Sequence, residues 1–455
     1  MNIRTFSIGG IHPEENKLTH DVATRPAALP RQAVFPLSQH IGAPAVPVVQ
    51  KGDKVRVGTL IADAGSFVSA PIYSSVSGTV LKIDTVIDAT GYRKPAIFIT
   101  VEGDEWEDTI DRSDRLETVA AHPELTPEEI INRVKKAGIT GMGGAGFPTF
   151  IKLTPPPTSK AECVIINAVE CEPYITADYR LMMEHPDEII VGLELLMKAV
   201  KVNKGYIGIE TNKPAAIELL GRKCAEAFSG SDFTVEVVPL KQRYPQGGEK
   251  QLVDAVIGRQ VPAPPAIPVS VGAIVQNVGT AYAVYEAVMK HKPLFERYTT
   301  VTGKRLQNPG NFLVRMGTPM QDLIDACGGM PEGDNKLLAG GPMMGKALTS
   351  TEVPVCKGTN SVTIISADEA CRPEPQPCIR CAKCVGACPM GLEPYLLAKL
   401  SEVKNWERAE HDDITSCIEC GSCQFTCPAH RPLLDNIRQG KQTVMGIIRA
   451  RAAKK

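Results

Sequence analysis

Short alternating stretches of apolar and polar residues predict a β-rich first part of the chain, to about residue 110. Turns at 51–54 and 77–79 are each followed by apolar residues, Val55 and Val57 after the first and Val80 and Ile83 after the second. Alternation with a period of two places every second side chain of a strand on the core. We therefore expect short strands joined by tight turns.

From about residue 126 the pattern changes to strands that alternate with helices. Thr126-Pro127-Glu128-Glu129 is a capping box with proline at the first helical position. The elements that follow are a strand over 162–167, a helix over 187–202, a strand over 205–210, a helix opening at 212–214 and a strand over 233–240. This alternation predicts a mostly parallel sheet covered by helices.

The last third of the chain predicts a second β-rich segment and then a helical one. Residues 296–350 have strand character, with a helix beginning near Pro319. A proline-rich linker over 372–377 leads into a cysteine-rich region. Apolar residues at helical spacing predict one amphipathic helix over 393–410.

Composition narrows the class of protein. The chain has 455 residues, enough for roughly three or four domains, and a formal net charge of -1, which gives no basic field for nucleic acid. No apolar stretch approaches the roughly 18 residues of a membrane span, and the N-terminus has no secretory pattern. With no export signal, the 14 cysteines indicate a reducing cytosol and thiolate chemistry.

Two cysteine runs carry the strongest chemical signal. They are Cys378-x2-Cys381-x2-Cys384-x3-Cys388-Pro389 and Cys417-x2-Cys420-x2-Cys423-x3-Cys427-Pro428. In two-cluster ferredoxins with this spacing, the fourth cysteine of each run ligates the other cluster. One [4Fe–4S] cluster would then take Cys378, Cys381, Cys384 and Cys427, and the other Cys417, Cys420, Cys423 and Cys388. A pair of zinc knuckles is the alternative, although such sites usually separate two CxxC pairs by a longer gap.

A glycine-rich loop, GMGGAGFPT at 141–149, is the second signal. It contains G-x-G-x-x-G, but the preceding residues 130–137 predict a helix where the dinucleotide fingerprint requires a strand. Successive glycines still let backbone N–H groups face an anion. A tight surface loop is the alternative.

Four segments together resemble the NADH-oxidising flavoprotein subunit of respiratory complex I: the glycine loop with Lys152, NAVECEP at 167–173, YPQGGE at 244–249 and QNVGT at 276–280. The resemblance implies catalytic Glu170, Glu172 and Glu249 near the nicotinamide. It also implies FMN bound by Gly141, Gly143, Gly144, Lys152, Asn167, Glu170, Gly247, Asn277 and Thr280. The way NAD(H) binds stays open, because Val169, Gly248 and Gly279 replace acidic residues and Ala266 falls where the family has an aromatic residue.

Over nearly its whole length the chain resembles the RnfC family, the C subunits of the Rnf ion-translocating ferredoxin:NAD+ oxidoreductase complex, with GGIHP at 9–13 and LAGGPMMG at 338–345 as further matches. The resemblance implies a multidomain α/β protein. Its expected domains are a structural, lipoyl-like barrel-sandwich hybrid at 1–115, a Rossmann-like FMN/NADH domain at 120–290, a β-grasp SLBB-like domain at 296–350 and a ferredoxin-like domain with two [4Fe–4S] clusters at 370–435. A basic tail at 436–455, including Lys454 and Lys455, is expected to be a solvated end, with attachment to acidic lipids as the alternative.

The implied function is electron transfer between NAD(H), FMN and two [4Fe–4S] clusters, coupled elsewhere in the complex to Na+ or H+ transport. A flavin is needed because NADH gives two electrons as a hydride, whereas a cluster accepts one. The expected location is peripheral, at the cytoplasmic face of the cell membrane. Expected partners are the other subunits of the complex, with ferredoxin reached through one of them, and no nucleic acid. The alternatives are a cobalamin reductase of a bacterial microcompartment, whose modules come in a different order, and a flavin and iron–sulfur relay with no NADH chemistry.

Overall fold

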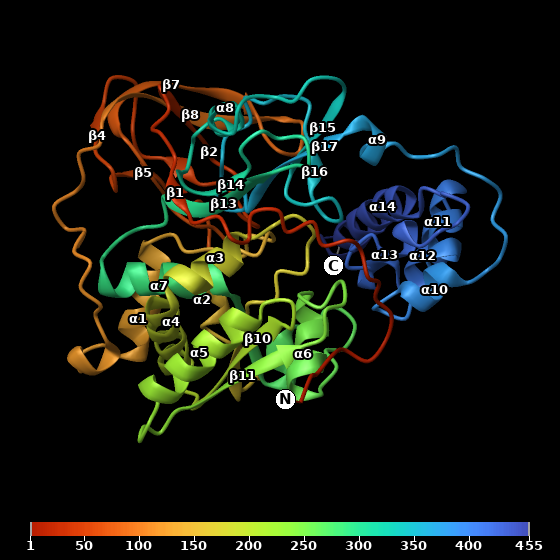
Figure 1. Ribbon diagram of the computed structural model, residues 1–455, viewed down its shortest axis with the longest axis horizontal. Helices are drawn as coiled ribbons and strands as arrows, with labels where there is room; N and C mark the ends of the chain where they lie inside the picture. Colours follow the sequence, from red (N-terminus) through yellow and green to blue (C-terminus); the bar gives the residue numbers. More distant parts are fainter. Residues whose placement is uncertain (1, 454–455) are drawn as a thin grey trace.

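A barrel-sandwich of short strands forms the first unit of the computed structural model, which describes residues 2–453 (Figure 1). One sheet has the order β2 (Gln32–Pro36), β8 (Arg93–Gly103), β7 (Ser77–Ile87), β4 (Lys54–Val55), and the other has the order β3 (Val46–Pro47), β5 (Leu60–Asp63), β6 (Ile72–Tyr73). Their facing side chains, among them Phe35, Ile61 and Ile97, are fully buried. The predicted short strands are confirmed, and alternate residues of β2 and β8 face the space between the sheets. In β7 the register shifts between Val80 and Lys82, and Ile83 is 44 % exposed instead of lying on the core.

Residues 2–26 run outside these two sheets and along the other units. Arg4 forms a bridge with Leu240, Ile11 forms one with Tyr244, and β1 (Arg25–Pro26) pairs with β14. In Figure 1 this red segment passes beside α10 and α13 before it reaches the barrel. The N-terminal segment therefore connects parts of the molecule that are far apart in the sequence.

The second unit is a parallel four-stranded sheet with the order β11 (Thr234–Leu240), β10 (Lys204–Glu210), β9 (Cys163–Asn167), β12 (Ala273–Asn277). One face is covered by α6 (Glu249–Ile257). The other face is covered by α1 (Pro127–Lys136), α3 (Ala177–Glu184), α4 (Pro186–Ala199), α5 (Pro214–Ala227) and α7 (Val278–Met289). The predicted parallel sheet and capping box are confirmed, since Thr126 accepts the Glu129 N–H. Strand order reverses at β9, which makes the crevice between the carboxyl ends of β9 and β12 the favoured ligand position.

A six-stranded mixed sheet forms the third unit, in the order β1, β14 (Gly310–Arg315), β13 (Glu296–Thr302), β17 (Ser361–Ser366), β15 (Asn335–Ala339), β16 (Lys346–Ala347). Its core packs α8 (Met320–Ala326) against Val301, Phe312 and Val362. The predicted helix near Pro319 is confirmed, with Pro319 immediately before it. The remaining short elements of the first three units are η1 (Val119–Ala121), α2 (Thr149–Lys152), η2 (Pro268–Val271) and α9 (Ala367–Ala370).

Short helices around the cysteine runs form the last unit, reached by an extended linker (Figure 1). They are α10 (Lys383–Ala387), α11 (Pro394–Glu402), α12 (Trp406–His411), η3 (Ile414–Ser416), α13 (Ser422–Phe425) and α14 (Leu433–Ala453). The prediction of one helix over 393–410 is wrong. The chain turns at Lys404, which has a φ of 55°, and the Asn405 side chain then accepts the Arg408 N–H to begin α12. Asparagine competes for such local bonds and favours caps over helix interiors.

The basic tail forms most of α14, which packs on the cysteine unit up to Val444, whereas residues 449–453 are exposed. Val444 is fully buried, Arg451 pairs with Glu410, and Lys441 Nζ donates to the Cys417 carbonyl at 2.8 Å. The helix therefore supports the cysteine unit through both packing and charge. Lys454 and Lys455 lie outside the described residues. Between residues 2 and 453, no helix combines the length and apolar character that crossing a bilayer requires.

Candidate functional site

Asn167 and Asn277 are register partners at the carboxyl ends of β9 and β12, where the strand order reverses. The Asn277 side chain caps α7 by accepting the Gly279 N–H at 2.9 Å, and its Nδ2 donates to Asp178 Oδ2 at 2.7 Å. Asn167 Nδ2 donates to the Gly247 carbonyl at 2.8 Å. The two amides thus bring the segments at 167–173, 244–249 and 276–280 to one crevice.

The glycine loop lies over this crevice. Gly141 N–H donates to the Phe147 carbonyl at 2.8 Å and Met142 N–H donates to Thr280 Oγ1 at 2.9 Å, so both ends of the turn are held. A Cβ at Gly143 would lie 3.4 Å from Asn277 Cβ, and Gly144 has a φ of 117° that favours glycine. Within the described residues, the backbone N–H groups of Gly143 and Gly144 find no acceptor. Exposed, unpaired amides of this kind fit the phosphate of FMN.

Buried polar atoms without a partner lie in the same segments. They are Glu170 Oε2, Gln246 Nε2 and Gln276 Nε2. A buried polar atom left unpaired costs about 1–3 kcal/mol, so such atoms indicate a missing bonding group. The pyrimidine edge of a flavin ring carries both donors and acceptors. The unpaired Glu170 Oε2 therefore fits a donor of the flavin ring, whereas the Gln246 side chain is held toward the N-terminal segment, where its Oε1 accepts from Thr5 Oγ1 at 2.9 Å.

Glu170 is a buried carboxyl of this crevice with a raised pKa. Its backbone is left-handed, with a φ of 49°, and its Oε1 accepts the Asp178 N–H at 2.7 Å. Burial raises the pKa of Glu170 to about 7, and the ammonium of Lys17 opposes that rise. Burial also raises the pKa of Asp178. Carboxyl groups that titrate near neutral pH in a cleft are typical of functional sites.

The other two predicted glutamates are engaged elsewhere. Glu172 Oε1 accepts the N–H groups of Met343 and Met344, at 2.6 and 3.0 Å, from the loop between β15 and β16. Glu249 begins α6 and accepts from Lys152 Nζ at 2.6 Å. Lys152 also donates to the Val275 carbonyl at 3.1 Å, on the strand that ends at the crevice. Of the three glutamates, Glu170 alone has a buried oxygen without a partner among residues 2–453.

Arg297 and Asp178 border the crevice, and sequence reasoning missed both. Arg297, only 3 % exposed on β13, donates to the Lys357 carbonyl and, at 3.4 Å, to the Met142 carbonyl of the glycine loop. Burial lowers its pKa to about 10, and the Asp178 carboxylate opposes that shift. Neither residue lies in a segment that resembles the flavoprotein family. A buried arginine within a strand was the only signal that could have found one of them.

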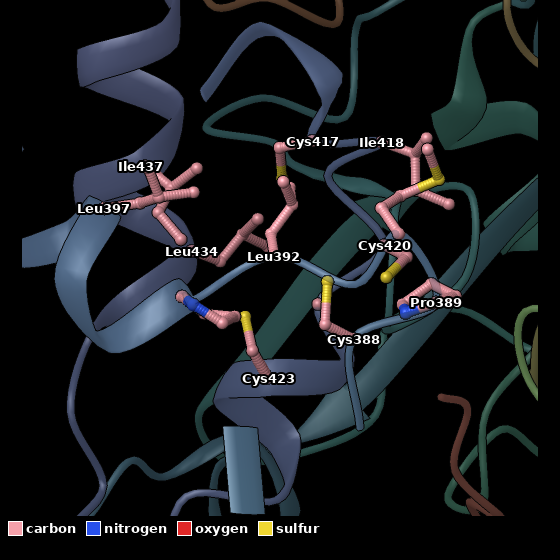
Figure 2. A pocket seen from close by; sticks show the side chains of 13 residues that line it. Cys388, Pro389, Leu392, Leu397, Cys417, Ile418, Cys420, Cys423, Leu434 and Ile437 are labelled. Carbon is pink, nitrogen blue, oxygen red and sulfur yellow. The ribbon is translucent and has the colours of Figure 1, made fainter. Parts of the chain in front are cut away.

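Four cysteines line one pocket in the last unit (Figure 2). They are Cys417, Cys420 and Cys423 of the second run and Cys388 of the first. Leu392, Leu397, Leu434 and Ile437 supply an apolar wall. Burial raises the pKa of Cys423, and the nearby Cys417, Cys420 and Cys388 raise it further. A largely apolar pocket with four sulfurs fits a [4Fe–4S] cluster.

The remaining cysteines of the two runs lie in a more open place. Cys378 and Cys381 are exposed, Cys427 is half-buried and Cys384 is buried. Burial raises the pKa of Cys384, and Cys427 contributes to that rise, so these two cysteines lie near each other. No three Cys, His, Asp or Glu side chains within residues 2–453 converge on a single-ion site. A four-iron cluster does not need such convergence, because each thiolate binds a different iron.

The cavity around Cys388 abuts the parallel-sheet unit. Tyr244 Oη donates to the Cys420 carbonyl at 2.8 Å, and Gln251 Nε2 donates to the Pro389 carbonyl at 3.1 Å. From the N-terminal segment, Gly10 N–H donates to the Ala387 carbonyl at 2.9 Å. The pocket shared by Cys388 and the second run therefore lies against the parallel-sheet unit, whereas Cys378 and Cys381 of the first run are exposed to solvent.

A glycine loop over the crevice of a parallel sheet, on the same chain as a unit with two cysteine runs, indicates a flavin- and iron–sulfur-containing electron-transfer protein. Family models agree with each unit: the RnfC barrel sandwich hybrid domain matches residues 5–104, the Nuo51 FMN-binding domain 134–286, the SLBB domain 298–347 and the 4Fe-4S dicluster domain 371–428. Two solved structures of an NAD+-reducing [NiFe]-hydrogenase, H2-reduced and air-oxidised, align over 70 % of this chain and 62 % and 66 % of theirs, with 21 % and 18 % identity and TM-scores of 0.48 and 0.49.

Curated relatives extend over almost the entire chain. The C subunit of the Na+-translocating ferredoxin:NAD+ oxidoreductase complex of Acetobacterium woodii is 41 % identical over 448 residues, 98 % of each chain. The proton-translocating counterpart of Clostridium ljungdahlii is 42 % identical over 406 residues, 89 % of this chain and 86 % of that one. The chain belongs to the RnfC family, the C subunits of ion-translocating ferredoxin:NAD+ oxidoreductase complexes. Its function is electron transfer within such a complex, and the cobalamin reductase alternative falls away.

Proposed function

We propose that electrons pass through this chain in the order NAD(H), FMN, second-run cluster, first-run cluster, and in reverse when NAD+ is reduced. The bond from Tyr244 to the carbonyl of Cys420 carries this proposal, because it joins the flavin-domain segment at 244–249 to a ligand of the second run. Gln251 and Gly10 add contacts on the same side of that cavity. The order follows, since the first-run ligands Cys378 and Cys381 are the exposed ones.

We infer that the crevice holds FMN. The amides of Gly143 and Gly144 would face its phosphate, with Gly141 opening the turn and Thr280 holding the loop through Met142. Further residues that would hold the cofactor are Lys152, Asn167, Glu170, Gly247 and Asn277. Bound FMN supplies the exchange between a two-electron hydride donor and one-electron carriers.

The three glutamates have different roles in this proposal. Glu170 Oε2, buried and unpaired, can hold a proton near neutral pH beside the flavin. Glu249 orients Lys152 through their 2.6 Å contact. Glu172 positions the loop at 340–345, where it accepts two backbone N–H groups. Glu170 is therefore the residue on which the chemistry depends most.

The ligand sets cross between the two runs. One cluster would be held by Cys417, Cys420, Cys423 and Cys388, and the other by Cys378, Cys381, Cys384 and Cys427. The shared cavity of Cys388 with the second run supports the first set, and the closeness of Cys384 to Cys427 supports the second. The crossing keeps the two clusters adjacent, which suits transfer between them.

We place the chain at the cytoplasmic face of the membrane, as a peripheral subunit bound to integral and peripheral subunits of the complex. The names of the relatives, which describe subunits of ion-translocating complexes, support this. Ferredoxin would reach the chain through another subunit, and the exposed first-run cluster would exchange electrons with that subunit. Ion transport, of Na+ or H+, would take place in the other subunits.

Anaerobic purification followed by iron, zinc and flavin analysis tests the function. We expect about eight irons and about one FMN per chain, with the flavin absorbance bleached by NADH. About two zincs and no flavin would contradict the proposal. A flavin reduced through the rest of the complex by ferredoxin, but left oxidised by NADH, would instead identify a relay without nicotinamide chemistry.

A further inference from the structure

Three large apolar side chains are exposed beside the first-run ligands. Ile379 is 68 % exposed and follows Cys378 directly. Phe425 is 56 % exposed and precedes Cys427 by two residues, and Tyr395 is 39 % exposed with its backbone N–H facing the Cys384 thiol. Exposed apolar groups gathered at one place mark an interaction site more often than scattered ones do.

The two cysteine runs differ sharply in exposure. Every residue from 371 to 383 is exposed, including Cys378 and Cys381. In contrast, Cys420 and Cys423 of the second run are only 7 % and 8 % exposed. An electron carrier has to approach a cluster closely, and the first-run loop is the side that a second protein can reach.

Positive charge borders this apolar group. Arg380 and Lys383 lie within the first run and are both exposed, and they outnumber Glu393, an exposed acid whose Oε1 accepts from Tyr395 Oη at 3.3 Å. A basic rim around an apolar centre favours a partner with an acidic rim, because opposite charges speed association and select orientation. An acidic lipid surface is negatively charged like an acidic protein, but it accepts no electron. It would therefore cover the exposed ligands without allowing electron transfer.

We propose that these residues form a docking face for an acidic electron-transfer protein that exchanges electrons with the first-run cluster. The exit face consists of Ile379, Arg380, Lys383, Tyr395 and Phe425. In each exchange one electron leaves the cluster and reduces the one-electron centre of the partner, and no bond or proton is transferred. The inference rests on the proposed order of the redox centres, and it adds the surface and the chemical class of the partner.

Two variants test the exit face. Phe425→Glu puts a negative charge at its apolar centre without altering the loop between the first three ligands. Arg380→Glu combined with Lys383→Glu reverses its rim. Tyr92→Glu, 71 % exposed at the turn between β7 and β8, is the matched control. Binding of each anaerobic holo chain to the remaining subunits of the complex, purified in detergent without this chain, is measured by biolayer interferometry at low and high salt.

At low salt we expect both variants to bind the remaining subunits about tenfold or more weakly, and the control to bind as the unmodified chain does. The charge reversal should also make this affinity less dependent on salt. Iron content and NADH–ferricyanide activity should stay at the unmodified level. If the charge reversal lowers the iron content, it has damaged the cluster loop, and the binding of Phe425→Glu is then the only test of the exit face. Unchanged binding in Phe425→Glu overturns the proposal.

A vesicle-binding experiment tests whether the exit face binds the membrane instead of a protein. Binding to phosphatidylglycerol vesicles that is lost in Phe425→Glu, while binding to the other subunits persists, would assign the face to the membrane and overturn the proposal. Failure of the proposed function is distinguishable, because it would appear as missing flavin or missing NADH reduction in the unmodified chain, whatever the binding result.

Discussion

The hydroxyl of Tyr244 donates a hydrogen bond to the backbone carbonyl of Cys420 at 2.8 Å, across 176 positions of the sequence. Tyr244 follows the last strand on one side of the flavin sheet, and it is 2 % exposed. Cys420 is the middle ligand of the second run. One buried bond thus joins the flavin-binding unit to a cluster ligand and sets their relative position.

Replacing Tyr244 by phenylalanine removes that bond and leaves the Cys420 carbonyl without its donor. We expect a loss of about 0.5–1.5 kcal/mol in the free energy of unfolding and slower electron transfer from flavin to cluster, at unchanged iron and FMN content. Anaerobic stopped-flow mixing with NADH measures the transfer. Tyr73→Phe is the control, because its hydroxyl also donates to a backbone carbonyl, that of Lys136, far from the clusters. Equal transfer rates in both variants would contradict the assignment.

Gly9→Ala should disturb the seat of the second-run cluster. Gly9 has a φ of 72°, and an added Cβ would lie 2.3 Å from the Cys388 carbonyl oxygen. Gly91→Ala is the control, with a φ of 80° and nothing within 4 Å of the added atom. In each variant the alanine occupies a left-handed backbone conformation, which costs about 1–2 kcal/mol. Only in Gly9→Ala does the added Cβ also clash with the Cys388 segment. Thermal unfolding and iron content should therefore fall further in Gly9→Ala, and equal losses would exclude a specific contact.

Exchanging single ligands distinguishes the crossed sets from uncrossed ones. We expect Cys427→Ser and Cys388→Ser each to lower the iron content from about eight toward about four per chain. In Cys427→Ser the cluster beside Tyr244 should survive, so flavin-to-cluster transfer should persist. In Cys388→Ser that transfer should be lost, while NADH still reduces the flavin. Stopped-flow absorbance checks both outcomes, and the opposite pairing would show that each run binds its own cluster.

Glu170→Gln should change how stability depends on pH. Because the folded state raises the pKa of Glu170 to about 7, the folded protein binds more protons than the unfolded one below that pH. Its stability should fall as pH rises from about 5 to about 7, by at most about 1.4 kcal/mol per unit. Glu170→Gln should flatten that fall in thermal unfolding midpoints measured across this range. A slope unchanged by the substitution would contradict the assigned pKa.

Lys357 should make the free energy of unfolding rise with pH, the opposite of the effect of Glu170, and Lys357→Met should abolish that rise. Lys357 is fully buried, its Nζ donates to the carbonyls of Pro71 and Gly138 at 2.6 and 2.8 Å, and burial lowers its pKa to about 7. The unfolded chain then binds more protons above that pH, so stability should rise between about pH 7 and about pH 10. Lys357→Met should remove this rise. Unfolding midpoints of both proteins over that range measure it, and parallel profiles would argue against a neutral lysine.

Local sequence patterns were enough to predict most of the helices and strands named above and the class of cofactor. Thr126-Pro127-Glu128-Glu129 predicted the start of α1 because a capping box acts within one helical turn. Parallel strands were predicted because buried runs alternate with helices. The cysteine spacing predicted iron–sulfur chemistry for the same reason: three ligands lie within one short loop. The single helix predicted over 393–410 failed where the local bond of Asn405 outweighs the apolar period.

The sequence by itself determined which chemistry this protein carries, since motifs for FMN and for two clusters depend on residues close together in the chain. Only the tertiary structure decided which cysteine run contacts the flavin-domain segment at 244–249. The contacts of Gly10 with Ala387, of Tyr244 with Cys420 and of Glu172 with Met343 join segments more than a hundred residues apart. No local pattern encodes such contacts, because they form only after separate units have packed. The same packing buries one set of cluster ligands and leaves Cys378 and Cys381 exposed.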